Sequence, residues 1–152
     1  MSGNTSLFRP TSITLPSFQP IEPEELEALV SIVKSGSPLD PAPPNIIKNA
    51  ATARYPTLRE LLNLSLSTAL TQKAWKHAVV KHLLKKPYLH SASSGNYRPI
   101  SLLPFPAKVL ERHVNRQLSD CLEQNNLLHS SQLGFCPRHS TESALLAVSE
   151  EL

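Results

Sequence analysis

The 152-residue sequence predicts an α+β fold that is mostly helical and carries one basic antiparallel hairpin. Leucine and valine recur at helical spacing in several segments, which indicates amphipathic helices. Two short runs rich in branched apolar residues, joined by a polar connection with proline and glycine, indicate paired strands. With 40% hydrophobic and 18% charged residues, the chain has the composition of a folded domain of ordinary size.

The first helix is expected over about residues 23–35, because Leu26, Leu29, Val30 and Val33 form one apolar stripe. Proline suits its first position, glutamates suit the positive end of its dipole, and Gly36 is expected to end it.

The proline-rich stretch at residues 38–44 cannot be helical, and a short helix is expected at residues 46–53. A longer helix is predicted over about residues 57–69, with Thr57 as its N-cap. Its inward face is expected to comprise Leu58, Leu61, Leu62, Ser65, Leu66 and Ala69.

The hairpin is predicted from strands at about residues 78–84 and 97–103, joined by a loop at residues 85–96. Pro99 places the second strand at a sheet edge or a bulge, because proline cannot donate to the strand ladder.

The second half of the chain predicts a long helix over about residues 105–124, ended by the two asparagines that follow it. Its inward face is expected to comprise Leu110, Val114, Leu118, Cys121 and Leu122. Residues 127–138 are expected to be irregular, with room for a short third strand near residues 133–136. A last helix is predicted to begin near Ser140, a good cap.

The charge of the chain is unevenly distributed along the sequence. Twelve of the 15 lysines and arginines lie between Lys48 and Arg116, together with two acids, whereas the other ten acids lie outside this stretch. Such a block, with a net charge of about +10, favours a polyanionic partner, nucleic acid first. A solvated basic surface without a partner is the alternative.

The common catalytic and metal-binding motifs are missing from the sequence. The glycine-rich nucleotide-binding motifs GxGxxG and GxxxxGK[ST] are both absent from the sequence. Cys136 and His139 could act as a nucleophile and its base, but no acid that would orient the histidine is identified. Zinc binding by His113, Cys121, His129, Cys136 and His139 is disfavoured, because their spacing matches no common zinc module. The chain is therefore expected to hold no metal and no cofactor of its own.

The predicted hairpin is the best candidate for a binding site in the sequence. It gathers four cations: Lys81, Lys85, Lys86 and Arg98. Such side chains satisfy phosphate oxygens, and arginine can hold two at once. The alternative is a lysine-rich edge strand that discourages aggregation.

Three stretches of the sequence resemble the N-terminal part of the reverse transcriptases of non-LTR, LINE-type retrotransposons, closest to the jockey-like group. They read NYRPISLLP at residues 96–104, KVLER at 108–112 and QLGFCPRHSTESALL at 132–146. The segments LDP at residues 39–41 and LLKKP at 83–87 fit the same family in order and spacing.

The resemblance implies the fingers of a right-hand polymerase, with the palm absent from this chain. Residues 1–20 are rich in serine, threonine and proline and show no sustained period, so a loose N-terminal arm is expected there. The resemblance implies a helical extension at 21–75 and a partial reverse transcriptase domain at 76–152. Lys85, Lys86 and Arg98 match basic positions of the family, which implies contacts with a nucleoside triphosphate or with RNA or DNA backbone.

The resemblance also implies that the loop holding Gln132, Gly134, Phe135 and Arg138 shapes the template and nucleotide side of the active site. The sequence departs from the family here. Cys136 stands where the family has an arginine, and Arg138 where it has a glycine, which puts nucleotide binding in doubt.

The family's catalytic aspartates lie in segments that this sequence does not contain. The resemblance therefore implies a truncated RNA-directed DNA polymerase that is inactive alone, with Mg²⁺ expected only in the complete polymerase. The alternative is a non-enzymatic helical interaction module derived from a retroelement. Besides nucleic acid, the chain is expected to bind another protein or the missing palm segment.

The sequence also predicts where in the cell the protein is located. Two cysteines make no disulfide framework, and no secretory leader or membrane-spanning run is found. An intracellular location is expected, with nucleus and cytoplasm both open.

Overall fold

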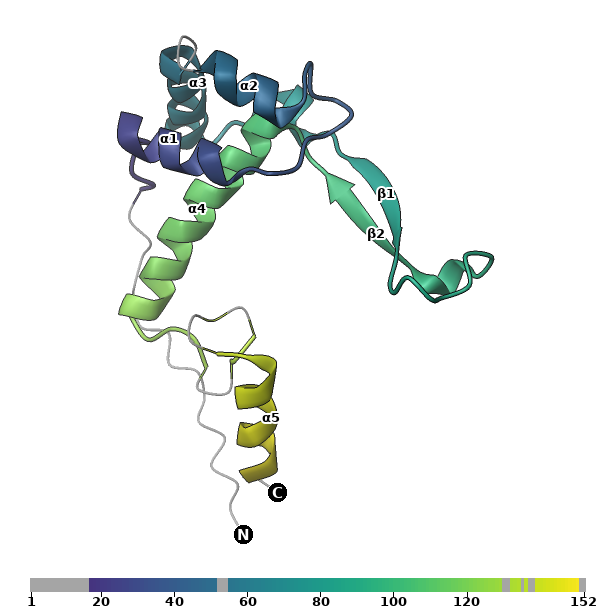
Figure 1. The fold of residues 1–152 in the computed structure, drawn as a ribbon. Coiled ribbons are helices and arrows are strands. Elements are labelled where there is room, and N and C mark those ends of the chain that lie inside the picture. The colour runs from purple at the N-terminus through teal and green to yellow at the C-terminus, as the bar shows by residue number, and fades with distance from the viewer. Residues whose placement is uncertain (1–16, 52–54, 130–131, 135, 137–138, 151–152) are drawn as a thin grey trace. The chain divides into compact units, whose positions relative to one another are not determined.

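The computed structural model of the chain describes residues 17–51, 55–129, 132–134, 136 and 139–150. This part is mostly helical and contains a two-stranded antiparallel sheet, so the predicted α+β class is confirmed (Figure 1). One compact unit spans residues 16–117, and residues from Leu118 onward belong to a second unit. None of the helices in the described residues is long and apolar enough to cross a bilayer.

Helix α1 (Pro23–Ile32) begins at the expected proline but ends three residues earlier than predicted. Val33 takes up extended backbone, with φ −69° and ψ 104°, and its side chain remains in the core. Gly36 therefore does not end the helix. It allows close packing instead, because a Cβ at this position would lie 3.0 Å from Cδ of Pro44.

Helix α2 (Pro44–Ala51) begins two residues before the predicted position, and the expected end of this helix lies outside the described residues. Helix α3 (Tyr55–Thr68) contains Thr57 in its first described turn, so the predicted N-cap is wrong. Ala69 is exposed and has a φ of 54°, so it ends α3 instead of continuing its inward face.

The hydrophobic core lies in the unit that spans residues 16–117. It joins α1, α3, the 3₁₀ turn η1 (Lys73–Lys76) and the first half of α4 (Phe105–Gln124). Its buried members are Ile21, Leu26, Leu29, Val30, Val33, Leu62, Trp75, Phe105, Ala107 and Val109. The apolar stripes predicted for α1 and for most of α3 are thus confirmed.

Helix α4 has the predicted bounds but a different buried face. Val109 and His113 are fully buried, whereas Leu110 and Val114 are half-buried and Leu118 is exposed. The prediction is correct for Leu110, which packs against the core, but it missed Val109 and His113, which lie one position before Leu110 and Val114 on the helix. A histidine was not counted as an inward-facing residue. Asn126, with a φ of 51°, follows the helix, as expected for a residue that tolerates left-handed backbone.

The second unit contains helix α5 (Thr141–Glu150). The Ser140 hydroxyl accepts a hydrogen bond from Ser143 N–H at 3.2 Å, and the Ser143 hydroxyl accepts one from Ser140 N–H at 2.8 Å. This reciprocal cap confirms the predicted start of the helix. Leu133, Gly134 and Cys136 are not in a strand, so the third strand is not found among the described residues.

Candidate nucleic-acid interface

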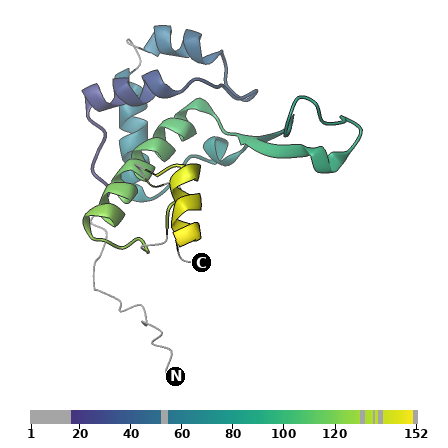
Figure 2. The same cartoon turned by 60° about the horizontal axis from the view of Figure 1, so that its bottom comes forward.

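The hairpin consists of β1 (Val79–Leu84) and β2 (Tyr97–Leu102), which pair antiparallel with Val79 opposite Leu102 and Leu84 opposite Tyr97. Within residues 16–117, the hairpin extends away from the helices in both ribbon views (Figures 1 and 2). Most of its contacts are between its own two strands. It is therefore a ribbon with two accessible faces.

The register decides which side chains share a face of the hairpin, because directly paired residues point to the same side. Lys81 pairs with Ile100 and Leu83 pairs with Arg98, so Lys81 and Arg98 are diagonal neighbours on one face. All four of these side chains are exposed. The opposite face carries a shallow hollow of about 330 Å³ lined by His82, Ser91, Ala92, Ser94 and Tyr97.

The base of the hairpin is fixed by the loop between α1 and α2. Ser37 donates its hydroxyl to the Leu102 carbonyl at 3.0 Å. One carboxylate oxygen of Asp40 accepts the Ser37 N–H, and the other accepts the Phe105 N–H at the start of α4, both at 2.7 Å. The carboxylate thereby ties this loop to the strand–helix junction and satisfies an amide at the positive end of the helix dipole.

The loop that joins the strands is held by its own hydrogen bonds. Lys85 donates its backbone N–H to the Asn96 carbonyl at 2.8 Å and its Nζ to the Gly95 carbonyl at 2.7 Å. The Asn96 amide donates to His90 O at 2.8 Å, and the Tyr97 hydroxyl donates to Ser91 O at 3.0 Å. A short 3₁₀ turn, η2 (Ser94–Asn96), completes the loop.

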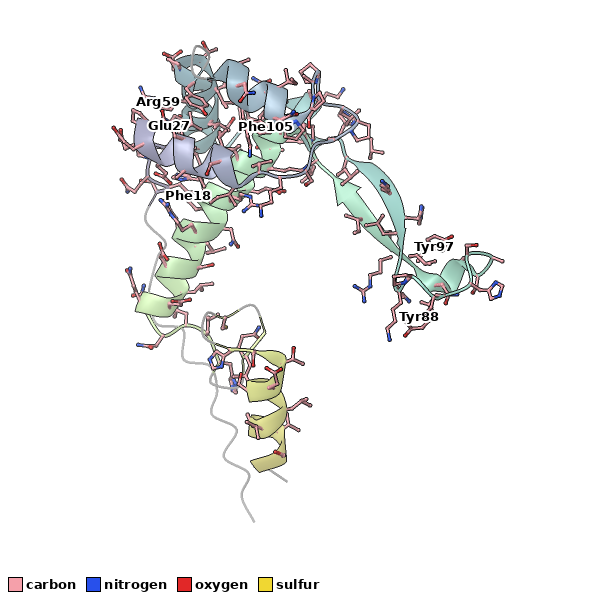
Figure 3. The ribbon with its side chains drawn as sticks, viewed as in Figure 1. Phe18, Glu27, Arg59, Tyr88, Tyr97 and Phe105 are labelled. Atoms are coloured by element: carbon pink, nitrogen blue, oxygen red, sulfur yellow. The ribbon has the colours of Figure 1, made fainter. Side chains whose placement is uncertain are left out.

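Lys86 and Tyr88 lie at the loop end of the hairpin, where Figure 3 shows Tyr88 and Tyr97. The Lys86 ammonium lies 5.5 Å from the centroid of the Tyr88 ring, within the range of a cation–π interaction. Lys85 and Lys86 are both exposed. The structure thus brings all four predicted cations onto the hairpin, two on one strand face and two just beyond β1.

No acidic residue occurs in the sequence between Glu60 and Glu111, a stretch that contains the whole hairpin and seven lysines or arginines. The ion pairs in the described residues lie among the helices: Glu22, the residue before α1, pairs with Arg59 of α3, and Glu25 of α1 pairs with His113 and Arg116 of α4. Among the described residues of the unit that spans 16–117, the hairpin cations therefore form no ion pair, and their positive charge is exposed.

The other predicted site residues belong to the second unit. Gln132 donates its side-chain amide to the Gly134 carbonyl at 2.9 Å, and the Cys136 thiol donates to the Gln132 carbonyl at 3.0 Å. Phe135 and Arg138 lie outside the described residues. That this loop and the hairpin contribute to one site stays a prediction.

An apolar cavity of about 380 Å³ lies in the helical part of the first unit. The described residues that line it include Ile46, Ile47, Tyr55 and Phe105, and none of these described residues is a lysine or arginine. Burial, with a smaller contribution from the Glu27 carboxylate, raises the pKa of Tyr55 above its usual value. Among the described residues, the lining of this cavity therefore presents no cation to a phosphate.

Metal-ligating side chains do not gather in the part of the chain that the structure describes: no group of three or more His, Cys, Asp or Glu side chains is found there. Asp40 uses both carboxylate oxygens on backbone amides, and Asp120 lies on the exposed side of α4.

Sequence reasoning missed two polar residues that position the hairpin and its supporting helix. No role is predicted for Asp40 from the sequence, and His113 is weighed there only as a zinc ligand. The His113 Nδ1 lies 2.6 Å from Oε1 of Glu25, and its Nε2 lies 2.8 Å from the Gln19 carbonyl oxygen. The available signal for Asp40 was its place between prolines in a segment that cannot be helical.

Comparison with known proteins shows similarity to RNA-directed DNA polymerases of mobile elements from Drosophila melanogaster. The chain is 32% identical over 142 residues to the probable RNA-directed DNA polymerase from transposon BS, and this alignment covers 90% of the chain and 15% of that protein. It is 32% identical over 78 residues to the probable RNA-directed DNA polymerase from transposon X-element, and this alignment covers 51% of the chain and 8% of the relative. It is 31% identical over 85 residues to the enzyme from mobile element jockey, over 56% of the chain and 9% of the relative.

The chain thus spans less than a sixth of the length of these relatives. No family model matches it. No solved structure matches it either. The resemblance that the three sequence stretches indicated is nevertheless confirmed by the relatives.

Proposed function

Because this chain is related in sequence to the RNA-directed DNA polymerases of jockey-like non-LTR transposons, we propose that its hairpin binds the sugar–phosphate backbone of RNA or DNA. The observation that carries this proposal is the exposed ribbon with Lys81, Lys85, Lys86 and Arg98 and no acid in its stretch of sequence. Phosphate neutralisation by such cations releases counterions and supplies sequence-independent affinity.

The hairpin would correspond to the fingers of the polymerase, with residues 21–75 as a helical extension before them and residues 76–152 as the partial reverse transcriptase domain. Supporting this assignment is the Asp40 carboxylate, which joins the helical part to the junction of β2 and α4. In the complete polymerase, Arg98 and the loop with Gln132 and Gly134 would face the template and the nucleoside triphosphate.

We further propose that the 152-residue polypeptide alone does not polymerise DNA. Two-metal nucleotidyl transfer needs carboxylates that hold two cations about 3.5–4 Å apart. The chain contains two aspartates, and both oxygens of Asp40 are engaged by the Ser37 and Phe105 amides. In this proposal, the carboxylates that hold Mg²⁺ for nucleotidyl transfer would come from a palm segment.

A non-enzymatic interaction module is the second candidate. It is favoured by the exposed apolar side chains of α5, namely Leu145, Leu146 and Val148. In that case a protein partner would cover the helix and the basic hairpin would be incidental. The two candidates differ in the role of charge, because an apolar interface is insensitive to moderate changes in salt.

The test uses a fluorescent RNA oligonucleotide and two variants of matched charge. In one variant the hairpin cations are reversed: Lys85→Glu, Lys86→Glu and Arg98→Glu. In the control, three exposed cations elsewhere are reversed: Lys34→Glu, Lys73→Glu and Arg112→Glu. Loss of binding in the hairpin variant, with binding retained in the control, is expected. Equal effects of the two variants would mean that only net charge matters, and would contradict the proposal.

A further inference from the structure

Tyr88 is the most exposed large apolar side chain among the described residues. Its exposed fraction is 76%, above the 71% of Leu70. It lies at the loop end of the hairpin, on the side where Lys85 and Lys86 leave β1 (Figure 3). We propose that Tyr88 is a stacking platform for an unpaired nucleobase, with Lys85 and Lys86 beside the phosphates. This inference rests on the proposed function and assigns the form of nucleic acid that the hairpin takes.

The exposure of Tyr88 is not explained by a lack of order in its loop. The Leu89 N–H donates to the Lys86 carbonyl at 3.2 Å, which makes a turn around Pro87 and Tyr88. The Lys85, Asn96 and Tyr97 side chains donate to carbonyls of the same loop. The loop is therefore formed before a ligand arrives, so the tyrosine can be presented without a large ordering cost.

Tyr97 is the internal comparison for Tyr88. It lies at the start of β2, is half-buried, and uses its hydroxyl to hold the Ser91 carbonyl at 3.0 Å. Tyr97 therefore supports the loop, whereas Tyr88 presents its ring to solvent. An exposed aromatic ring in an otherwise polar, basic loop is typical of surfaces that bind single-stranded nucleic acid.

The neighbouring charges restrict the occupant. Lys86 lies over the ring at 5.5 Å, Lys85 is adjacent, and no acid occurs between Glu60 and Glu111. An apolar or cationic peptide would gain little here, whereas a nucleic-acid strand, which carries one phosphate for each nucleotide, complements the site. Bases inside a duplex are already stacked on each other and cannot reach a protruding ring, so the ligand is an unpaired segment.

The test measures fluorescence anisotropy with three labelled ligands: an unpaired oligouridine of about twelve nucleotides, an abasic oligonucleotide of the same length, and a duplex. The proteins are the full chain, Tyr88→Ala and Tyr88→Phe. Tyr88→Ala is expected to weaken oligouridine binding roughly fivefold to 150-fold, and Tyr88→Phe to bind like the unaltered chain. Binding of the abasic strand is expected to be weaker and unaffected by either substitution.

Thermal melts of the three proteins should coincide, because the Tyr88 side chain is exposed. Two outcomes would overturn the stacking site: equal affinity for oligouridine and the abasic strand, or equal affinity of Tyr88→Ala and the unaltered chain for oligouridine. If the binding still depended on salt, the proposed phosphate binding would stand. Stronger binding of the duplex than of oligouridine would overturn the stacking site as well. No binding of any of the three ligands would overturn the proposed function together with this inference.

Discussion

At the scale of single residues, His113 joins the N-terminal segment and α1 to α4. Its two ring nitrogens contact the Glu25 carboxylate and the Gln19 carbonyl, and the ring is fully buried. The same carboxylate pairs with Arg116, whose side chain is 53% exposed. The sequence could not identify this role, because apolar periodicity selects the neighbouring stripe of leucines and is silent on a buried polar group with partners far along the chain.

Removal of His113 should destabilise the helical unit far more than removal of Arg116. We expect His113→Ala to lower the free energy of unfolding by about 2–4 kcal/mol, because it leaves a cavity and removes the buried partner of the Glu25 carboxylate and of the Gln19 carbonyl. Arg116→Ala is expected to change it by about 0–1 kcal/mol, as for other exposed ion pairs. Urea denaturation of the two variants measures the difference, and equal effects would contradict the assignment.

Asp40 gives a second prediction at the residue scale. Asp40→Ala removes acceptors for the Ser37 and Phe105 amides and is expected to destabilise the chain by about 1–2 kcal/mol. Asp40→Asn retains one oxygen and should fall between Asp40→Ala and the unaltered chain. The exposed Asp120→Ala is the control and should stay within about 0.5 kcal/mol. Thermal or urea unfolding distinguishes these outcomes, and an Asp40→Ala chain as stable as the control would contradict the role.

At the scale of elements, the sequence predicts the hairpin and α4 well, since strand composition and the asparagine pair mark their limits. The ends of α1 and α3 were not predictable to the residue. Val33 leaves the helix while its side chain stays in the core, and Ala69 takes up left-handed backbone without being glycine. Tertiary packing decides both, and local propensity does not contain that information.

The hairpin should be less stable than the helices that support it. A two-stranded ribbon that contacts mainly itself is marginal in water, whereas α1, α3 and the first half of α4 share a buried core. Native-state hydrogen exchange should therefore show faster exchange for the paired amides of β1 and β2 than for the amides around Leu26, Leu62 and Val109. Equal protection of strands and helices would indicate that the hairpin has packing partners beyond those described.

At the scale of the whole molecule, relatedness to transposon polymerases came from short motifs, whereas the physical candidate for a site came from charge distribution. Both select Lys85, Lys86 and Arg98, and the structure places them on one ribbon. The relation of this ribbon to the loop with Gln132 could not be predicted, because no charge or apolar pattern in the sequence links the two units.

The whole polypeptide is also expected to be inactive in primer extension. With an RNA template, an annealed primer, deoxynucleotides and Mg²⁺, the 152-residue chain should give no extended product, because its carboxylates do not form a two-metal site among the described residues. Magnesium-dependent product that is lost with a chelator would contradict this account. A polymerase of known activity in the same buffer is the positive control.

The most direct measurement of the central claim is the salt dependence of binding to an unpaired RNA. We compare the full chain with a variant in which the hairpin cations are neutralised: Lys85→Gln, Lys86→Gln and Arg98→Gln. If these side chains contact phosphates, the plot of log affinity against log salt should be shallower by about 2 in the variant, since each lost contact releases about 0.7 fewer ions. An identical slope for both proteins, or affinity that does not change with salt, would contradict a phosphate-binding hairpin.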